Sequence, residues 1–76
     1  MIHEHDPVVL LHDLPAQSLK AGDVGVVVHV HQAGAAFEVE FLTLAGETAA
    51  IETLRKEEVR EVRADEMPQA RERVAA

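Results

Sequence analysis

Residues 19–41, LKAGDVGVVVHVHQAGAAFEVEF, form the stretch that decides the fold. A Gly-Asp-x-Gly turn leads into a β-branched run, a short Gly-containing turn follows, and an alternating segment closes the stretch. Val and Phe favour strands, and Gly supplies the backbone freedom that tight turns need. The pattern therefore predicts a β-hairpin at the centre of a small, strongly bent sheet. The residues expected to define turns are Gly22, Asp23, Gly25, Gly34 and, further along the chain, Gly46.

The clearest alternation in the chain is the sequence FEVEFLT, which starts at Phe37. Successive side chains of a strand point to opposite faces, so Phe37, Val39 and Phe41 are expected in the core and the intervening glutamates in solvent. The run at residues 24–31 is expected to turn its even-numbered valines inward. In a later strand, Ile51 is the expected core residue.

Turns divide the rest of the chain into short apolar segments. Strands are expected at residues 8–11, 24–31, 37–43, 48–53 and 59–63, with a loop at residues 13–23 and a single helical turn at residues 54–58. Leu14 and Leu19 of the loop are expected to fold back over the core. Five strands joined by short turns and one longer loop predict an all-β fold, a small five-stranded SH3-like barrel formed by residues 1–63.

Residues 64–76, ADEMPQARERVAA, differ in composition and form a C-terminal extension. They contain few β-branched residues and several good helix formers, and Pro68 suits the first position of a helix. A helical extension this short would be marginal alone. It is therefore expected to dock, either on its own barrel or on a second copy, with Met67 and Val74 as apolar anchors.

The composition argues against several classes of function. With 76 residues the chain forms one domain, too small for both a filled core and a deep catalytic cleft. It has no cysteine, which excludes disulfides and thiol chemistry, and its one serine, Ser18, lies in no nucleophile motif. We therefore expect a non-enzymatic protein without a cofactor. No signal sequence or long apolar run is recognisable, so a cytoplasmic protein without membrane contact is expected.

The net charge of −7 bears on the choice of partner. Binding to nucleic acid depends on neutralisation of phosphates by Lys and Arg, so an acidic chain without Trp or Tyr is not expected to bind it. The expected partner is a protein. Because a small aliphatic core stabilises a monomer only marginally, a homo-oligomer formed through the extension or a strand edge is a further expectation.

Histidines and glutamates of the hairpin are the candidate metal ligands. His29 and His31 alternate with valines, so they are expected to share the outer face, and Glu38 and Glu40 are expected on the same face of the next strand. Imidazole nitrogens and carboxylate oxygens bind Zn²⁺ and Ni²⁺. The alternative is a set of solvated cross-strand polar pairs. His12, at the end of the first strand, is expected at the rim of the barrel.

The chain also resembles a known family over residues 1–63. The shared features are an acidic residue before a Val-rich strand, a D-L-P loop, a G-D-x-G-x-V-V hairpin, an E-V-E-F strand and a G-E-T turn. In this chain they begin at Asp6, Val8, Asp13, Gly22, Glu38 and Gly46. The family is the small bacterial one catalogued as domain of unknown function forty-nine twenty-six. The resemblance implies an SH3-like barrel, transfers no catalytic residue, and implies an antitoxin-like or chaperone-like companion role.

The Gly-Asp-x-Gly turn followed by Val also resembles the KOW element of ribosomal and transcription-elongation proteins, which implies RNA or ribosome association. Those proteins are basic around the turn, whereas this chain has only Lys20 there. The expected function is therefore a small acidic non-catalytic protein-binding module that uses its loops, its outer hairpin face or an open strand edge. KOW-like RNA binding and metal binding by the outer-face His/Glu cluster are the alternatives.

Overall fold

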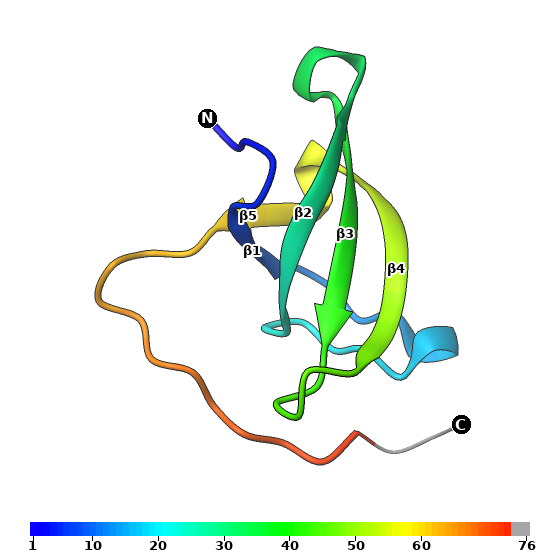
Figure 1. Cartoon of the computed structure of the whole chain (residues 1–76), viewed down its shortest axis with the longest axis vertical. Helices are drawn as coiled ribbons and strands as arrows, with labels where there is room; N and C mark the ends of the chain where they lie inside the picture. The colour runs from blue at the N-terminus through cyan, green and yellow to red at the C-terminus, as the bar shows by residue number, and fades with distance from the viewer. Residues whose placement is uncertain (74–76) are drawn as a thin grey trace.

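A computed structural model describes residues 1–73 of the chain (Figure 1). Five strands form a single antiparallel sheet with the order β4-β3-β2-β1-β5. The strands are β1 (Pro7–Leu10), β2 (Val24–His31), β3 (Ala36–Leu42), β4 (Thr48–Arg55) and β5 (Val59–Glu61), and three single-turn 3-10 helices connect them, η1 (Pro15–Gln17), η2 (Gln32–Gly34) and η3 (Lys56–Glu58). The described residues contain no α-helix, so the predicted all-β class is confirmed.

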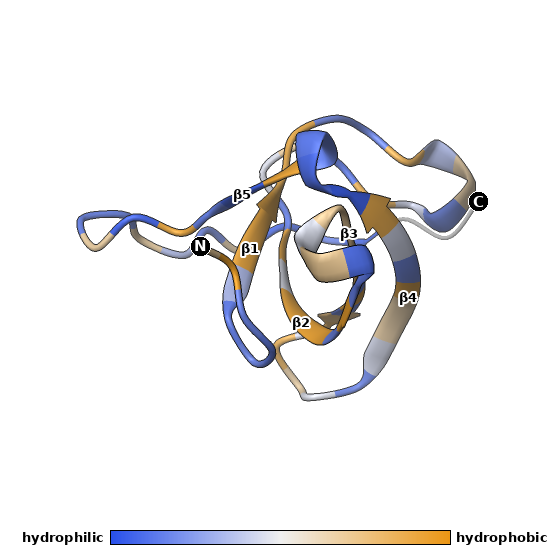
Figure 2. Ribbon diagram, turned by 90° about the horizontal axis from the view of Figure 1, so that it is seen from above, coloured by the Kyte–Doolittle hydropathy of each residue, from blue (hydrophilic) through white to orange (hydrophobic). Residues whose placement is uncertain are grey.

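The sheet curls around a common interior but stays open. Seen from above in Figure 2, the five strands curve around the apolar centre. Strands β4 and β5 are the two edges, and within residues 1–73 neither pairs with the other. The closed barrel expected from the sequence is therefore not formed. After Arg55, η3 turns the chain so that the short strand β5 pairs with β1, with Leu10 opposite Val59.

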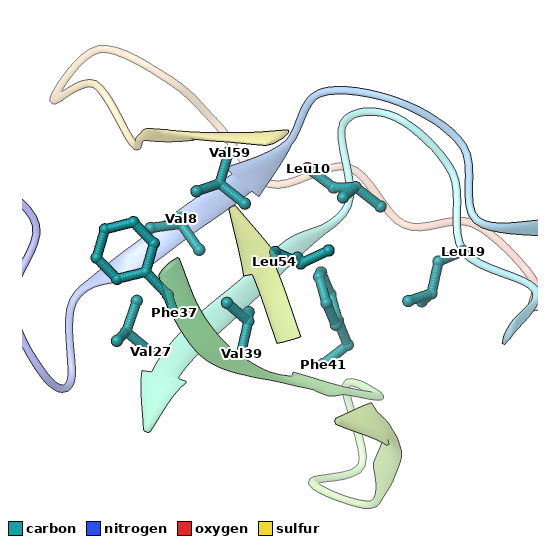
Figure 3. Packing of buried hydrophobic residues seen from close by; sticks show 9 residues of the cluster. All are labelled: Val8, Leu10, Leu19, Val27, Phe37, Val39, Phe41, Leu54 and Val59. Carbon is teal, nitrogen blue, oxygen red and sulfur yellow. The ribbon is translucent and has the colours of Figure 1, made fainter. Parts of the chain in front are cut away.

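The core is aliphatic and is built on β3. Phe37, Val39 and Phe41 are all buried, which confirms the alternation predicted for this strand. Their partners come from every other strand and from the loop before β2, as Figure 3 shows. The remaining members of the cluster are Val8, Leu10, Leu19, Val27, Leu54 and Val59. Leu14 packs against this cluster and bridges to Leu19, so the loop does fold back over the core as predicted.

Expected core positions on two strands are wrong, because the pairing of each strand with β3 decides which of its residues face inward. Ile51 pairs with Glu40 on the outer face of the sheet and is 54% exposed. In β2 the inward residues before residue 28 are Gly25 and Val27, and Val24 and Val28 are exposed, whereas Val30 packs against the core as expected. A β-bulge between Val27 and His29 then shifts the alternation, since one extra residue moves every following side chain to the other face.

The C-terminal extension is not helical in the part that the structure describes. Residues 64–73 contain no helix or strand, and every one of them is exposed. Met67, an expected anchor, is 88% exposed, and Val74 lies outside the described residues. The segment has no apolar face to bury, which a short helix would need for stability. In Figure 1 it leaves β5 and runs along the side and base of the sheet.

No helix in residues 1–73 is long and apolar enough to cross a membrane.

Gly25 lies inside β2 in an inward position, directly opposite Phe41. A Cβ at this position would lie 2.5 Å from Cγ1 of Val39 and 3.0 Å from Cδ1 of Phe41. By contrast, Gly22, Gly34 and Gly46 have positive φ angles and open space around them. The glycine in β2 therefore allows the two core side chains of β3 to fill the space beneath the strand.

We predict that Gly25→Ala lowers the free energy of unfolding by about 1–3 kcal/mol, because the added methyl group overpacks the core. Urea denaturation with an unchanged m-value would measure this loss. The control is Val24→Ala, at the preceding, exposed position, which should change the free energy of unfolding by less than about 0.5 kcal/mol. Equal stability of Gly25→Ala and the native chain would contradict the packing role of this glycine.

Candidate functional site

The histidines of the hairpin lie together on the outer face. The rings of His29 and His31 are 4.5 Å apart between centroids, at an angle of 71°. His29 pairs with Glu38 across the hairpin, and His31 Nε2 lies 3.9 Å from Glu38 Oε2. Glu40 lies opposite Val26, and its Oε2 accepts a 2.6 Å hydrogen bond from a threonine hydroxyl of β4. The four sequence-predicted ligands therefore do not converge.

No group of three or more His, Cys, Asp and Glu side chains within residues 1–73 has a metal-binding arrangement. His29 is exposed, His31 and Glu38 are half-buried, and no polar or charged side chain within residues 1–73 is buried. What these three side chains can contribute is cross-strand polar pairing, which is worth about 0.2–1 kcal/mol per pair.

An apolar surface adjoins this cluster on the same side of the sheet. Val24 is 48% exposed, Leu42 is 45% exposed and Ile51 is 54% exposed, on β2, β3 and β4 respectively. Continuing the pairing of Gly25 with Phe41 by one residue brings Val24 beside Leu42, and Ile51 lies opposite Glu40. We call Val24, Leu42 and Ile51 the outer apolar face. Sequence reasoning missed it because it placed Val24 and Ile51 in the core.

Strand β4 supplies an exposed edge next to this face. It is eight residues long, and within the described part of the chain it has a strand neighbour on the β3 side only. Its outer backbone groups can therefore accept a further strand. One inward position carries Glu52, which lies opposite Val39 and is only partly buried. An inward-pointing charge is a device by which natural edge strands limit uncontrolled pairing.

The loop between β1 and β2 is fixed by two aspartates. Asp23 Oδ2 accepts the backbone N–H of Lys20 at 2.8 Å, and Asp13 Oδ1 accepts that of Ala21 at 2.9 Å. Asp23 also binds the guanidinium group of Arg71 from the C-terminal extension. Partial burial acts to raise the pKa of Asp23, but the hydrogen bonds from Arg71 and Lys20 outweigh it and the pKa lies below its usual value.

A second polar contact joins this loop to η3. His12 Nε2 lies 2.8 Å from Glu58 Oε2, and the other carboxylate oxygen of Glu58 accepts the backbone N–H of Arg55 at 2.8 Å. The hydrogen bond with Glu58 raises the pKa of His12. The backbone hydrogen bond from Arg55, followed by that with His12, lowers the pKa of Glu58. The sequence placed His12 at the rim, whereas the structure uses it to tie the first loop to the segment that leads into β5.

The N-terminal segment borders a hollow of about 760 Å³ at the opposite end of the hairpin. Ile2, Val30 and Phe37 supply apolar lining, and Lys56 lies at its border. The terminal amino group is 2.9 Å from a carboxylate oxygen of Glu61. The lining is largely apolar, and it does not bring a nucleophile and a base together. The hollow therefore has no catalytic arrangement among its lining residues.

We predict that the stability of the protein falls as the pH rises above about 6.5, because of His12. Its pKa is raised on folding, so its contribution is fully present below the unfolded value of about 6.5 and is lost as the pH rises through the folded pKa. Glu58 has a lowered pKa, so its contribution is lost only as the pH falls through that lower value. Urea denaturation midpoints, measured at several pH values below and above about 6.5, would measure this fall in stability.

The variant His12→Gln should show little of this fall, whereas His29→Gln, which removes a histidine from the outer face, should retain it. If the stability of the His12→Gln variant depended on pH as that of the native chain does, the contact between His12 and Glu58 would not be the cause of the fall.

Comparison with known proteins gives one positive result. The family model described as Domain of unknown function (DUF4926) matches residues 4–61, which include all five strands. No curated protein and no solved structure matches the chain. The matched range contains Asp23, the outer apolar face and the whole of β4, and it ends before the C-terminal extension. The chain belongs to the DUF4926 family, a family of unknown function.

Proposed function

We propose that the protein is a small non-catalytic protein-binding module that binds an extended segment of a partner along the edge of β4. The observation that carries this proposal is an eight-residue edge strand beside an exposed apolar face. A segment that adds to the edge gains backbone hydrogen bonds, and its alternate side chains can cover neighbouring residues of the sheet. Ile51, on β4 itself, and Leu42, on the adjacent strand, are placed to receive them.

The charge of the surface indicates the chemistry of the partner. The whole chain carries a net charge of −7. Glu38 and Glu40 lie on the outer side of β3, and Glu47 is exposed in the turn between β3 and β4. A basic segment with interspersed apolar residues is complementary in sign, and opposite charge accelerates association. We therefore propose a basic, partly apolar protein segment as the ligand.

Membership in this family supports a companion role. We propose that a neighbouring gene encodes the partner, and that the module acts as its antitoxin-like or chaperone-like companion in the cytoplasm. The strand order β4-β3-β2-β1-β5 with η3 between β4 and β5 supports an SH3-like arrangement of the open sheet. A second copy of the chain could use the same edge, and the oligomeric state would show it. The net charge of −7 argues against RNA binding, and no three His, Cys, Asp or Glu side chains within residues 1–73 are grouped as metal ligands.

The test is a tagged pull-down with the native chain and the double variant Leu42→Ser/Ile51→Ser, followed by isothermal titration of the purified partner. The matched control is Leu11→Ser, because Leu11 is 46% exposed but lies outside the outer apolar face. We predict that the double variant weakens the partner's binding about tenfold or more, since burial of two aliphatic side chains contributes a few kcal/mol. The control should bind like the native chain.

Two results would contradict the proposal. Equal binding by the native chain and the double variant would place the partner elsewhere on the molecule. Loss of all captured material after ribonuclease treatment, with a steep dependence of binding on salt, would favour RNA or ribosome association instead.

A further inference from the structure

Two arginines of the C-terminal extension are bound to the folded domain. Arg71 donates from Nε to Asp23 Oδ1 at 2.8 Å, from Nη2 to Asp23 Oδ2, and from Nη2 to the carbonyl oxygen of Ser18 at 3.1 Å. Arg73 donates from Nη2 to the carbonyl oxygens of Gln17 at 3.0 Å and Ala49 at 3.3 Å. The first guanidinium group is thus held by both oxygens of one carboxylate.

The acceptors are arranged by the domain itself. Asp23 is held by the backbone N–H of Lys20, and its side chain is only 18% exposed. The positions of the carbonyl oxygens of Gln17 and Ser18 are set by η1 and by Ser18, which ends this helix in a left-handed conformation. Asp13 adds negative charge near Arg71. We call Asp23 with the carbonyl oxygens of Gln17, Ser18 and Ala49 the arginine seat.

The arginine seat and the segment that fills it belong to different parts of the chain. All four acceptors lie within residues 4–61, the range that the family model matches. The two arginines lie outside that range. Residues 64–73 are exposed throughout and bury no apolar anchor, so polar contacts take the place of the apolar docking that the sequence suggests. Arg60 of β5 donates to both carboxylate oxygens of Glu66, and the two arginines donate to acceptors of the domain. A segment held in this way can be displaced by a competitor with the same two side chains.

We propose that the arginine seat is a binding site for an extended Arg-x-Arg segment of another protein, and that residues 71–73 occupy it as an intramolecular competitor. In an extended chain, residues i and i+2 point to the same side, which lets two arginines reach Asp23 and Ala49 together. Arginine fits better than lysine because its planar guanidinium group donates in parallel to both carboxylate oxygens. The carbonyl of Ala49 lies at the start of β4, so a ligand could continue from the seat along this edge.

The experiment measures binding of a fluorescent peptide with the sequence of residues 64–76, by fluorescence anisotropy, to the full native chain and to the full-length variant Arg71→Ala/Arg73→Ala. The native chain holds its own arginines at a high effective concentration, so the variant should bind the peptide about tenfold more tightly. Both substitutions fall on the exposed extension, and circular dichroism would verify that the fold is retained.

Two further peptides make the test specific. A peptide with both arginines replaced by lysine should bind the variant about tenfold more weakly, because the paired hydrogen bonds to the carboxylate are lost. A peptide that carries Arg-Glu-Arg between Gly-Ser flanks should bind the variant within about threefold of the original peptide, because the two arginines supply the contacts. These two comparisons change only the peptide. They therefore do not require a variant in the loop, such as Asp23→Asn, to fold.

Three outcomes would overturn the proposal. The first is equal binding of the peptide by the native chain and the variant, and the second is equal binding of the arginine and lysine peptides. The third is a native chain that sediments as a dimer and a variant that sediments as a monomer, which would assign the seat to a second copy of this chain. None of these results depends on Leu42 or Ile51, so the protein-binding proposal for the β4 edge is tested separately.

Discussion

The close approach of β2 to β3 at Gly25 is the constraint on which the rest of the structure depends. With no Cβ at this position, the side chains of Val39 and Phe41 fill the space under the central strand. The two aromatic residues of the chain, Phe37 and Phe41, both lie in the resulting core. The rest of this core is aliphatic and comes from all five strands and the loop before β2. The absence of a Cβ at Gly25 therefore lets β2 lie close against the core side chains of β3.

The curled sheet has an open edge at β4. Strand β5 has three residues and pairs with β1, and within residues 1–73 it does not pair with β4. The eight residues of β4 keep one side without a strand neighbour in the described part of the chain. An open edge is prone to unspecific pairing, and an inward charged residue such as the partly buried Glu52 is a device by which natural edge strands limit it. The outer apolar face and the arginine seat then lie beside β4 and at its start.

The sequence predicted the features that follow from short-range rules. The hairpin and the inward row of β3 follow from an uninterrupted alternation, and the all-β class follows from the spacing of turns. The bulge in β2 could not be located, because three consecutive valines give no signal of which residue is the extra one. Ile51 is exposed because the pairing with Glu40, a tertiary feature, decides its face. The extension contains two arginines spaced by one residue, and only the folded loop shows that Asp23 receives one of them.

Hydrogen exchange of the β4 backbone amides, measured residue by residue with nuclear magnetic resonance, tests the open edge most directly. In an open sheet only the amides that point toward β3 are protected, so protection should alternate along Thr48–Arg55. Addition of the partner should then protect the remaining amides. Uniform protection of β4 in the free protein would show that another strand already covers this edge, and it would contradict the account.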